Sequence, residues 1–167
     1  MEEIQVKPRR RIIDFGKICT DVFCVKSGIV RLFHVDDAKE STFGFASPGT
    51  IFMSPLSFYL DAPAFLMAET CKIPATLLRM NRATFYSFIN GSDEFARWMF
   101  SLASAQICIC ERKLSLINGS AMERYQAVLK NRPEIVEAVT DRVLASYLEI
   151  TPQHLCRLKQ QLRDKHS

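Results

Sequence analysis

Apolar and polar residues follow two different periods along the chain, and the change falls near Met80. Before Met80, short runs rich in β-branched and aromatic residues alternate with turn signals, which is typical of a β-sandwich or barrel. Gly28 interrupts one such run and predicts a bulge or a tight turn. The expected strands begin at Ile4 and include segments 24–35, 41–46, 51–53 and 76–80, with further turns at 36–39 and at Pro48-Gly49.

After Met80 the apolar residues recur every three or four positions, which predicts helices. Most of these helices have a recognisable start, because Ser, Thr and Asn favour the N-cap and Pro favours the first turn. The expected helices are 82–88 after Asn81, a long helix after Ser92, 121–130 after a capping box of Ser120 and Glu123, 133–139 from Pro133, 141–148 after Thr140, and one from Thr151-Pro152 to about residue 163.

The long helix carries a largely apolar stripe whose members alternate in spacings of three and four. That period is typical of a coiled-coil seam, and a helix of this length needs a second surface to cover it. A homodimer is therefore expected, and a helix packed only on its own domain is the alternative. The expected seam consists of Phe95, Trp98, Leu102, Ile109 and Leu116, with Ala105 in register and Arg112 weakening it.

Two helices near the carboxyl end have the layout of a helix-turn-helix. Leu144, Ala145 and Leu148 form the apolar stripe of the first helix, and Ala145 is small where two helices must cross closely. Glu149-Ile150 forms the turn, and the stripe of the second helix is made of leucines at 155, 158 and 162. In such a motif the second helix enters the major groove of DNA. A helical hairpin in an all-α bundle is the alternative that spacing leaves open.

The polar face of that second helix supplies the candidate DNA contacts. Arg157 can pair bidentately with guanine and Gln153 with adenine. Thr140 and Arg142, at the start of the preceding helix, are placed to contact phosphate. The expected DNA-binding residues are Thr140, Arg142, Thr151, Gln153, His154, Arg157 and Lys159.

Composition narrows the class of protein only moderately. The chain has 48% hydrophobic residues and a net charge of +4, so it is globular and permits a polyanionic partner without requiring one. There is no secretory signal and no run of 18 apolar residues, which favours a cytoplasmic protein without a membrane span. The six cysteines contain no C-x-x-C pair, so reduced, mostly buried thiols are expected rather than a zinc site or a disulfide framework.

Catalysis is not expected. Metal-dependent oxygenases built on β-rolls need two or three His and a carboxylate close together, and only His34 of the three His lies in the β-rich half. The sequence has neither a Gly-rich phosphate loop nor a nucleophile elbow. No catalytic residue, metal or cofactor is therefore predicted.

Three segments together resemble the Crp/Fnr (cyclic-AMP receptor protein-like) transcription regulators, most closely the short Bacteroidetes-type members. They are SAMERYQAVL at 120–129, VLASYLEITPQHLCRLK at 143–159, and residues 12–52 with the Lys26-Ser27-Gly28 and Pro48-Gly49 turns. The resemblance implies an α+β protein with a β-roll sensor and a short helix at 1–91, a dimerisation helix at 92–117 and a helix-turn-helix domain at 118–167. It also implies a homodimer that reads a two-fold symmetric operator on double-stranded DNA. Arg157 falls at the family's base-reading arginine, and Thr151, Gln153 and His154 at the neighbouring positions.

The sequence departs from the family in three places: the turn of the helix-turn-helix, the β-roll and the segment after the recognition helix. Glu149 stands where the family usually has glycine, at a position that favours a left-handed backbone. Cyclic-AMP-binding members place a Gly-Glu pair and an arginine after Gly49, whereas residues 40–71 contain no Lys or Arg, so cyclic AMP is not expected. Phe52, Met53, Phe58 and Phe65 either line a pocket for an unidentified apolar effector or fill the roll, and filling is favoured. No β-hairpin wing is expected after the recognition helix.

Glu149, the absence of a wing and the modest net charge keep a second function open, a sensor or protein-interaction module of the same fold that does not read DNA sequence. Whether Gln153 and Arg157 project into solvent distinguishes the two functions.

Overall fold

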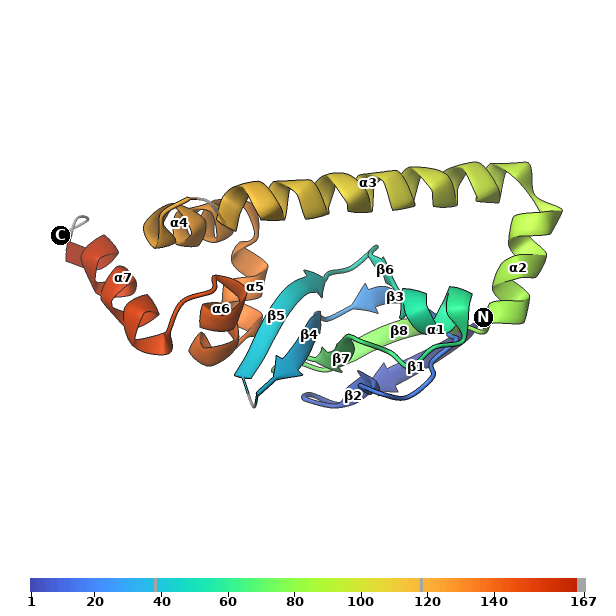
Figure 1. Cartoon of the computed structure of the whole chain (residues 1–167), viewed down its shortest axis with the longest axis horizontal. Helices are drawn as coiled ribbons and strands as arrows, with labels where there is room; N and C mark the ends of the chain where they lie inside the picture. The colour runs from blue at the N-terminus through green and yellow to red at the C-terminus, as the bar shows by residue number, and fades with distance from the viewer. Residues whose placement is uncertain (38, 118, 165–167) are drawn as a thin grey trace.

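The computed structural model describes residues 1–37, 39–117 and 119–164, with residues 112–117 described as backbone only. Strands and helices segregate along the chain, as the change of period predicts. The strands lie between residues 2 and 80, and all helices but one follow them. In Figure 1 the strands form a roll, helix α3 (Asp93–Ile117) runs along it, and the last helices gather at the end of the roll opposite helix α2 (Arg82–Gly91).

The roll is made of two four-stranded antiparallel sheets. One sheet has the order β1-β8-β3-β6 and consists of Glu2–Val6, Ala75–Met80, Val22–Ser27 and Ile51–Phe52. The other has the order β2-β7-β4-β5 and consists of Arg11–Ile13, Met67–Thr70, Val30–Asp36 and Lys39–Ala46. Alternate residues of both sheets point inward and bury a core that includes Val25, Val30 and Leu77.

Glycines form the turns at which they were predicted. Gly28 separates β3 from β4 with a φ of +83°, and a Cβ at this position would lie 2.5 Å from the carbonyl oxygen of Pro74. Only glycine fits there, because both the backbone conformation and the space exclude a side chain. Gly49 also has a positive φ, in the turn before β6.

One helix within the β-rich half of the chain was not predicted. Helix α1, Pro55–Leu60, lies between β6 and β7. Ser54 is its N-cap and accepts a hydrogen bond from the backbone N–H of Ser57, and Pro55 occupies the first turn. This is the Ser/Thr-Pro start that also predicted the last helix of the chain.

The predicted helices after residue 80 are all present. They are α2 Arg82–Gly91, α3 Asp93–Ile117, α4 Ala121–Asn131, α5 Pro133–Ala138, α6 Asp141–Tyr147 and α7 Pro152–Asp164. The capping box is confirmed: the backbone N–H of Ser120 donates to the Glu123 carboxylate at 2.7 Å, and the Glu123 N–H donates to the Ser120 hydroxyl at 3.2 Å. The expected end of the first of these helices at residue 88 is wrong, because α2 continues through Asn90 and Gly91, with Ser92 as its C-cap.

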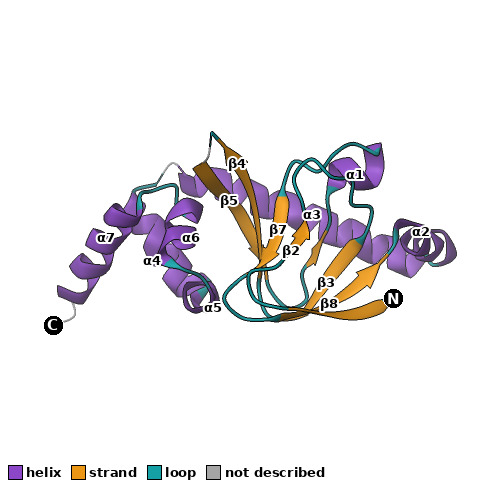
Figure 2. Cartoon of the chain, turned by 90° about the horizontal axis from the view of Figure 1, so that it is seen from below, coloured by secondary structure: helices purple, strands orange, loops and turns teal. Residues whose placement is uncertain are grey.

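Helices α4–α7 share a hydrophobic core with the roll. Ile29, Phe45 and Cys71 of the roll are buried in the same cluster as the apolar residues of these helices. The backbone N–H of Lys72 donates to the carbonyl of Ala138 at 3.0 Å, which ties the chain after β7 to the end of α5. Figure 2 shows α4–α7 beside β5, at one edge of the sheets. The helical unit is therefore packed on the roll as well as tethered to it by α3.

Candidate nucleic-acid interface

Helices α6 and α7 form a tightly packed pair joined by a short turn. Leu144, Ala145 and Leu155 are fully buried between them, and the N–H of Ile150 donates to the carbonyl of Ala145 at 3.0 Å. The methyl group of Ala145 allows the two helix backbones to approach closely, as the sequence predicts. The pair therefore has the geometry expected of a helix-turn-helix.

The turn between them contains the left-handed residue that the sequence predicts. Glu149 has a φ of 57°, a conformation that costs a non-glycine residue about 1 kcal/mol. The remainder of the turn compensates for this cost. Ile150 donates its N–H to α6, and Thr151 caps α7 by accepting from the N–H of His154 at 3.2 Å. Glutamate therefore replaces glycine without preventing the turn.

Helix α7 buries Leu155 and Leu158, half-buries Leu162 and exposes a polar face. Gln153, Arg157 and Gln160 are exposed and lie within about one third of the helix circumference. Cys156 is exposed on the same face, which sequence reasoning did not predict. His154 is half-buried and lies to one side of this face. In Figure 1 helix α7 lies at the end of the molecule farthest from α2.

Of the candidate phosphate contacts, Thr140 and Lys159 already have a partner within the protein. The Thr140 hydroxyl caps α6 by accepting from the N–H of Val143 at 3.3 Å, and its own hydrogen can still be donated to a phosphate oxygen. Arg142 is exposed. Lys159 is 2.5 Å from the Asp141 carboxylate, so part of its positive charge is neutralised by α6.

The expected seam on α3 divides into two parts. Phe95 is half-buried and packs on Phe85 and Phe88 of α2, so it serves a contact within the chain. Leu102 is also half-buried, whereas Trp98 and Ile109 are 48% and 57% exposed. The side chain of Leu116 lies outside the described residues. Trp98 and Ile109 thus form an apolar stripe on α3 that the described part of the chain leaves largely uncovered.

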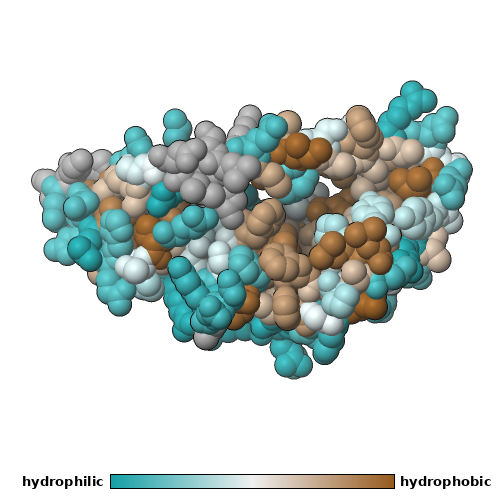
Figure 3. All heavy atoms as spheres, viewed as in Figure 1, coloured by the Kyte–Doolittle hydropathy of each residue, from teal (hydrophilic) through white to brown (hydrophobic). Residues whose placement is uncertain are grey.

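The opposite side of α3 is also apolar. Phe100 and Ile107 are exposed and lie about half a turn away from Trp98 and Ile109. Figure 3 shows that the molecule is hollowed between α3 and the roll and that apolar side chains gather along the hollow. A helix with this much exposed apolar surface is unusual on a monomeric protein.

The four residues proposed for an effector pocket do not converge. Phe52 stacks on Phe23 inside the roll at 5.3 Å between ring centroids. Phe58 is buried in a second cluster against Phe85 of α2, and Met53 packs at the edge of that cluster. Phe65 lies on the surface, more than half exposed, and stacks on His34. Phe52 and Phe58 are thus buried in two separate clusters, whereas Phe65 fills no part of the roll, and the four residues do not define one cavity.

The polar side chains around α1 are paired with other groups of the same chain. The hydroxyl of Ser57 donates to the carbonyl of Ala62, and that of Ser54 donates to Ser57. The nearby Arg82 side chain reaches the Phe58 carbonyl and pairs with Asp61 at 2.7 Å. Every polar group named here already has a partner within the chain.

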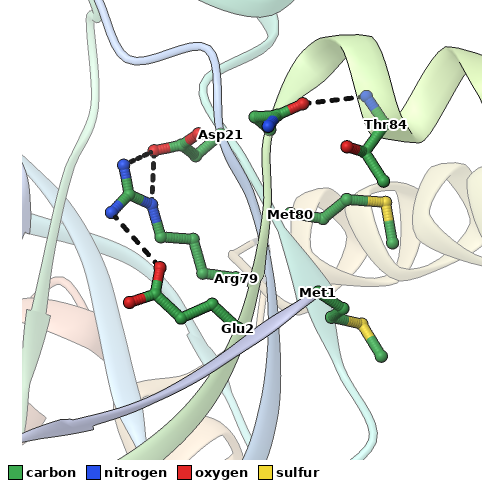
Figure 4. A pocket seen from close by; sticks show the side chains of 7 residues that line it. Met1, Glu2, Asp21, Arg79, Met80 and Thr84 are labelled. Atoms are coloured by element: carbon green, nitrogen blue, oxygen red, sulfur yellow. Dashed lines mark hydrogen bonds and ion pairs between the residues drawn. The ribbon is translucent and has the colours of Figure 1, made fainter.

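A pocket of about 300 Å³ lies elsewhere, at the end of the roll near α2. Figure 4 shows Arg79 held between Asp21 and Glu2, whose carboxylates lie 2.7 and 3.8 Å from its guanidinium. The hydrogen bond to Asp21 raises the pKa of Arg79. The charge of the pocket is therefore largely neutralised internally. Its lining residues are Met1, Glu2, Asp21, Arg79, Met80, Asn81 and Thr84.

The cysteines, which all lie within the described residues, are free, but the expectation that most of them are buried is wrong, because Cys71 alone is buried and Cys19, Cys24 and Cys110 are half-buried. Cys108 and Cys156 are exposed, whereas Cys71 is buried and its pKa is raised by burial to about 12. Burial also raises the pKa of Cys19 and Cys24. Within the described ranges, no group of three His, Cys, Asp or Glu residues could hold a metal ion. Among the same residues, no helix has the length and apolar character that a membrane crossing requires.

Comparison with known families identifies the roll. Residues 3–92 match the model of the cyclic nucleotide-binding domain. The chain belongs to the cyclic nucleotide-binding domain family. A search of curated proteins finds no match to the sequence.

Several solved structures share the fold of the whole chain. FixK2 from Bradyrhizobium japonicum superposes with a TM-score of 0.85 at 18% identity, over 99% of this chain and 85% of FixK2. The c-di-GMP-responsive regulator CLP from Xanthomonas campestris gives 0.77 at 16% identity, over 99% and 87%. A CRP/FNR-family transcriptional regulator from Thermus thermophilus gives 0.76 at 16% identity, over 98% and 87%. The expected resemblance to Crp/Fnr regulators and the expected α+β fold are therefore confirmed.

Proposed function

We propose that this member of the cyclic nucleotide-binding domain family is a homodimeric transcription regulator that reads a two-fold symmetric DNA operator with α7. One observation supports this most strongly. Helix α7 is held by buried leucines on α6 and presents Gln153 and Arg157 to solvent at the free end of the molecule. These side chain types make bidentate contacts to adenine and guanine in the major groove.

Each part of the chain has a role in this proposal. Residues 1–91 form the sensor, 92–117 the dimerisation helix and 118–167 the DNA-binding domain. Arg157, Gln153 and His154 contact bases, while Thr140, Arg142, Thr151 and Lys159 contact the phosphate backbone. Trp98, Leu102, Ile109 and Leu116 pair with their copies in the second protomer. No catalytic step is part of the function.

Binding of the purified protein to random-sequence duplex DNA tests whether this surface recognises DNA at all. Arg142 and Lys159 of two protomers supply about four cationic phosphate contacts, so the affinity should fall about 10²-fold between 50 and 200 mM salt. Fluorescence anisotropy of a labelled duplex measures this change. No binding even at 50 mM salt would favour the second candidate function, a sensor or protein-interaction module. The partial neutralisation of Lys159 by Asp141 is the observation that favours that second function.

We also propose that the roll does not take cyclic AMP, because the segment around α1 offers its phosphate no free cation. Cyclic AMP at a concentration of about 1 mM should leave the thermal unfolding midpoint unchanged. A ligand bound at 100 times its Kd would instead stabilise the protein by about 2.7 kcal/mol, a shift of several degrees. Such a shift would contradict this part of the proposal.

A further inference from the structure

Arg31 is a charged side chain that the folded protein buries almost completely, on the face of the sheet away from the roll core. Its neighbours Val30 and Leu32 point into the core, so strand alternation directs Arg31 to the opposite face. Only 2% of Arg31 is exposed. A buried guanidinium is costly unless all of its donors are paired.

The roll provides most of the partners of this guanidinium. Its Nε donates to the Thr42 hydroxyl on β5 at 2.8 Å. One terminal nitrogen lies 2.9 Å from the Glu40 carboxylate and 3.4 Å from that of Glu69. The guanidinium also stacks over the Phe33 ring, 4.0 Å from its centroid. Arg31 is thus fixed to three strands of one sheet, β4, β5 and β7.

The second terminal nitrogen of the guanidinium points out of the roll, into the helix-turn-helix. The second terminal nitrogen of Arg31 donates to the hydroxyl of Ser146 on α6 at 3.3 Å. Ser146 also lies 2.5 Å from the Thr42 hydroxyl, and it donates to the carbonyl of Val143 one turn back in its own helix. Next to this polar contact, Tyr147 packs edge-on against Phe45 of β5. The sensor and the DNA-binding unit therefore meet at a specific polar junction surrounded by apolar side chains.

We propose that Arg31 is a positioning residue for DNA recognition. By joining Thr42 on β5 to Ser146 on α6, it fixes the orientation of the helix-turn-helix relative to the roll of its own protomer. This inference rests on the proposed function. Because α6 and α7 are packed as one body, that orientation sets where α7 of each protomer stands and hence which half-site separation the dimer accepts. A movement of β4 relative to β5 is transmitted to α7 through the same contact of Arg31 and Thr42 with Ser146.

The Ser146→Ala variant tests this role with little risk to folding. Alanine is the best helix former, and Arg31 keeps its partners on the roll. Ser87→Ala is the matched control, because Ser87 on α2 makes the same hydroxyl-to-carbonyl bond three residues back, to Thr84 at 2.8 Å, but is far from the junction. Thr42→Val removes the junction from the roll side.

Two duplexes are compared, one with the preferred half-site separation and one with an extra base pair between the half-sites. The readout is the affinity for the first divided by the affinity for the second. In Ser146→Ala and Thr42→Val this ratio should fall about tenfold, the factor that corresponds to one hydrogen bond to a charged group, and in Ser87→Ala it should not change. A residue with a merely structural role would lower the stability and leave the ratio unchanged. An unchanged ratio in both junction variants would therefore overturn the inference.

A second measurement keeps the inference testable if the wild type shows no sequence-specific binding. Hydrogen exchange of the Lys72 amide, bonded to Ala138, reports whether the helical unit separates from the roll. Ser146→Ala should accelerate this exchange while the core strands of the roll remain protected, and Ser87→Ala should not. Equal exchange in the wild type and Ser146→Ala would overturn the junction itself, whereas faster exchange without specific DNA binding would leave the junction intact and overturn only the proposed function.

Discussion

The Ile109→Glu variant is expected to be monomeric and to bind a two-half-site duplex at least about 100-fold more weakly than the wild type. In the proposed dimer Ile109 faces its copy in the second protomer, so the substitution would bring two carboxylates together in an apolar seam. Desolvating unpaired charges costs several kcal/mol, which corresponds to a factor of this size or more. Analytical ultracentrifugation measures the change in mass and fluorescence anisotropy the change in affinity.

Ile107 provides a closely matched control for this variant. It lies on the same helix two residues earlier, has a similar exposed fraction (63% against 57%) and faces the other side of α3. Ile107→Glu should therefore remain dimeric. If both variants are monomeric, the seam includes the second apolar side of α3. If both are dimeric, the dimer does not use the Ile109 stripe, and this part of the proposal is wrong.

The Arg157→Ala variant is expected to lose about 1–3 kcal/mol of binding free energy, or roughly 5- to 150-fold in affinity, at one base pair of each half-site. The loss should disappear when that base pair is already substituted, because a bidentate contact to guanine depends on the identity of the base. Anisotropy titrations with a set of singly substituted duplexes measure this dependence.

Arg142→Ala gives the contrasting behaviour. Arg142 is exposed on α6 and is proposed to contact phosphate, so its loss from both protomers should weaken binding equally for all sequences and lower the slope of log affinity against log salt by about 2. If Arg157→Ala behaved in this way instead, Arg157 would be a phosphate contact and another residue of α7 would read the bases.

Local signals predicted most of the helices correctly, because caps and apolar periodicity act within a few residues. The Ser120–Glu123 capping box and the Thr151-Pro152 start both mark real helix ends. The Ser54-Pro55 start of α1 was overlooked because it lies within a stretch that otherwise resembles strands. The same rule, applied there, would have found it.

Contacts between distant segments were harder to predict, since no local pattern specifies them. The sequence showed that Phe52, Phe58 and Phe65 are apolar, but their separation into two cores and a surface stack depends on how the roll closes. The junction of Arg31 with Ser146 joins residues 115 positions apart, and the pairing of Lys159 with Asp141 depends on the crossing of α6 and α7. Burial of Arg31 in a strand would have been an unusual prediction from sequence alone.

The candidate DNA contacts fall between these two cases. Helical periodicity was sufficient to place Gln153 and Arg157 on the face opposite the leucines, and both are exposed. It could not show that His154 would be half-buried to one side or that Cys156 would share the exposed face, because these details depend on how α7 is rotated on α6.

Selection of binding sites from random duplex DNA, with the wild type and with Arg157→Ala in parallel, tests the central claim most directly. The account predicts that the wild type enriches an inverted repeat whose half-sites lie about 34 Å apart, one turn of the duplex, and that one position of each half-site loses its preference in the variant. A wild-type selection at low salt that enriches no sequence, or one that enriches a single half-site without symmetry, would contradict a dimer reading DNA with two copies of α7.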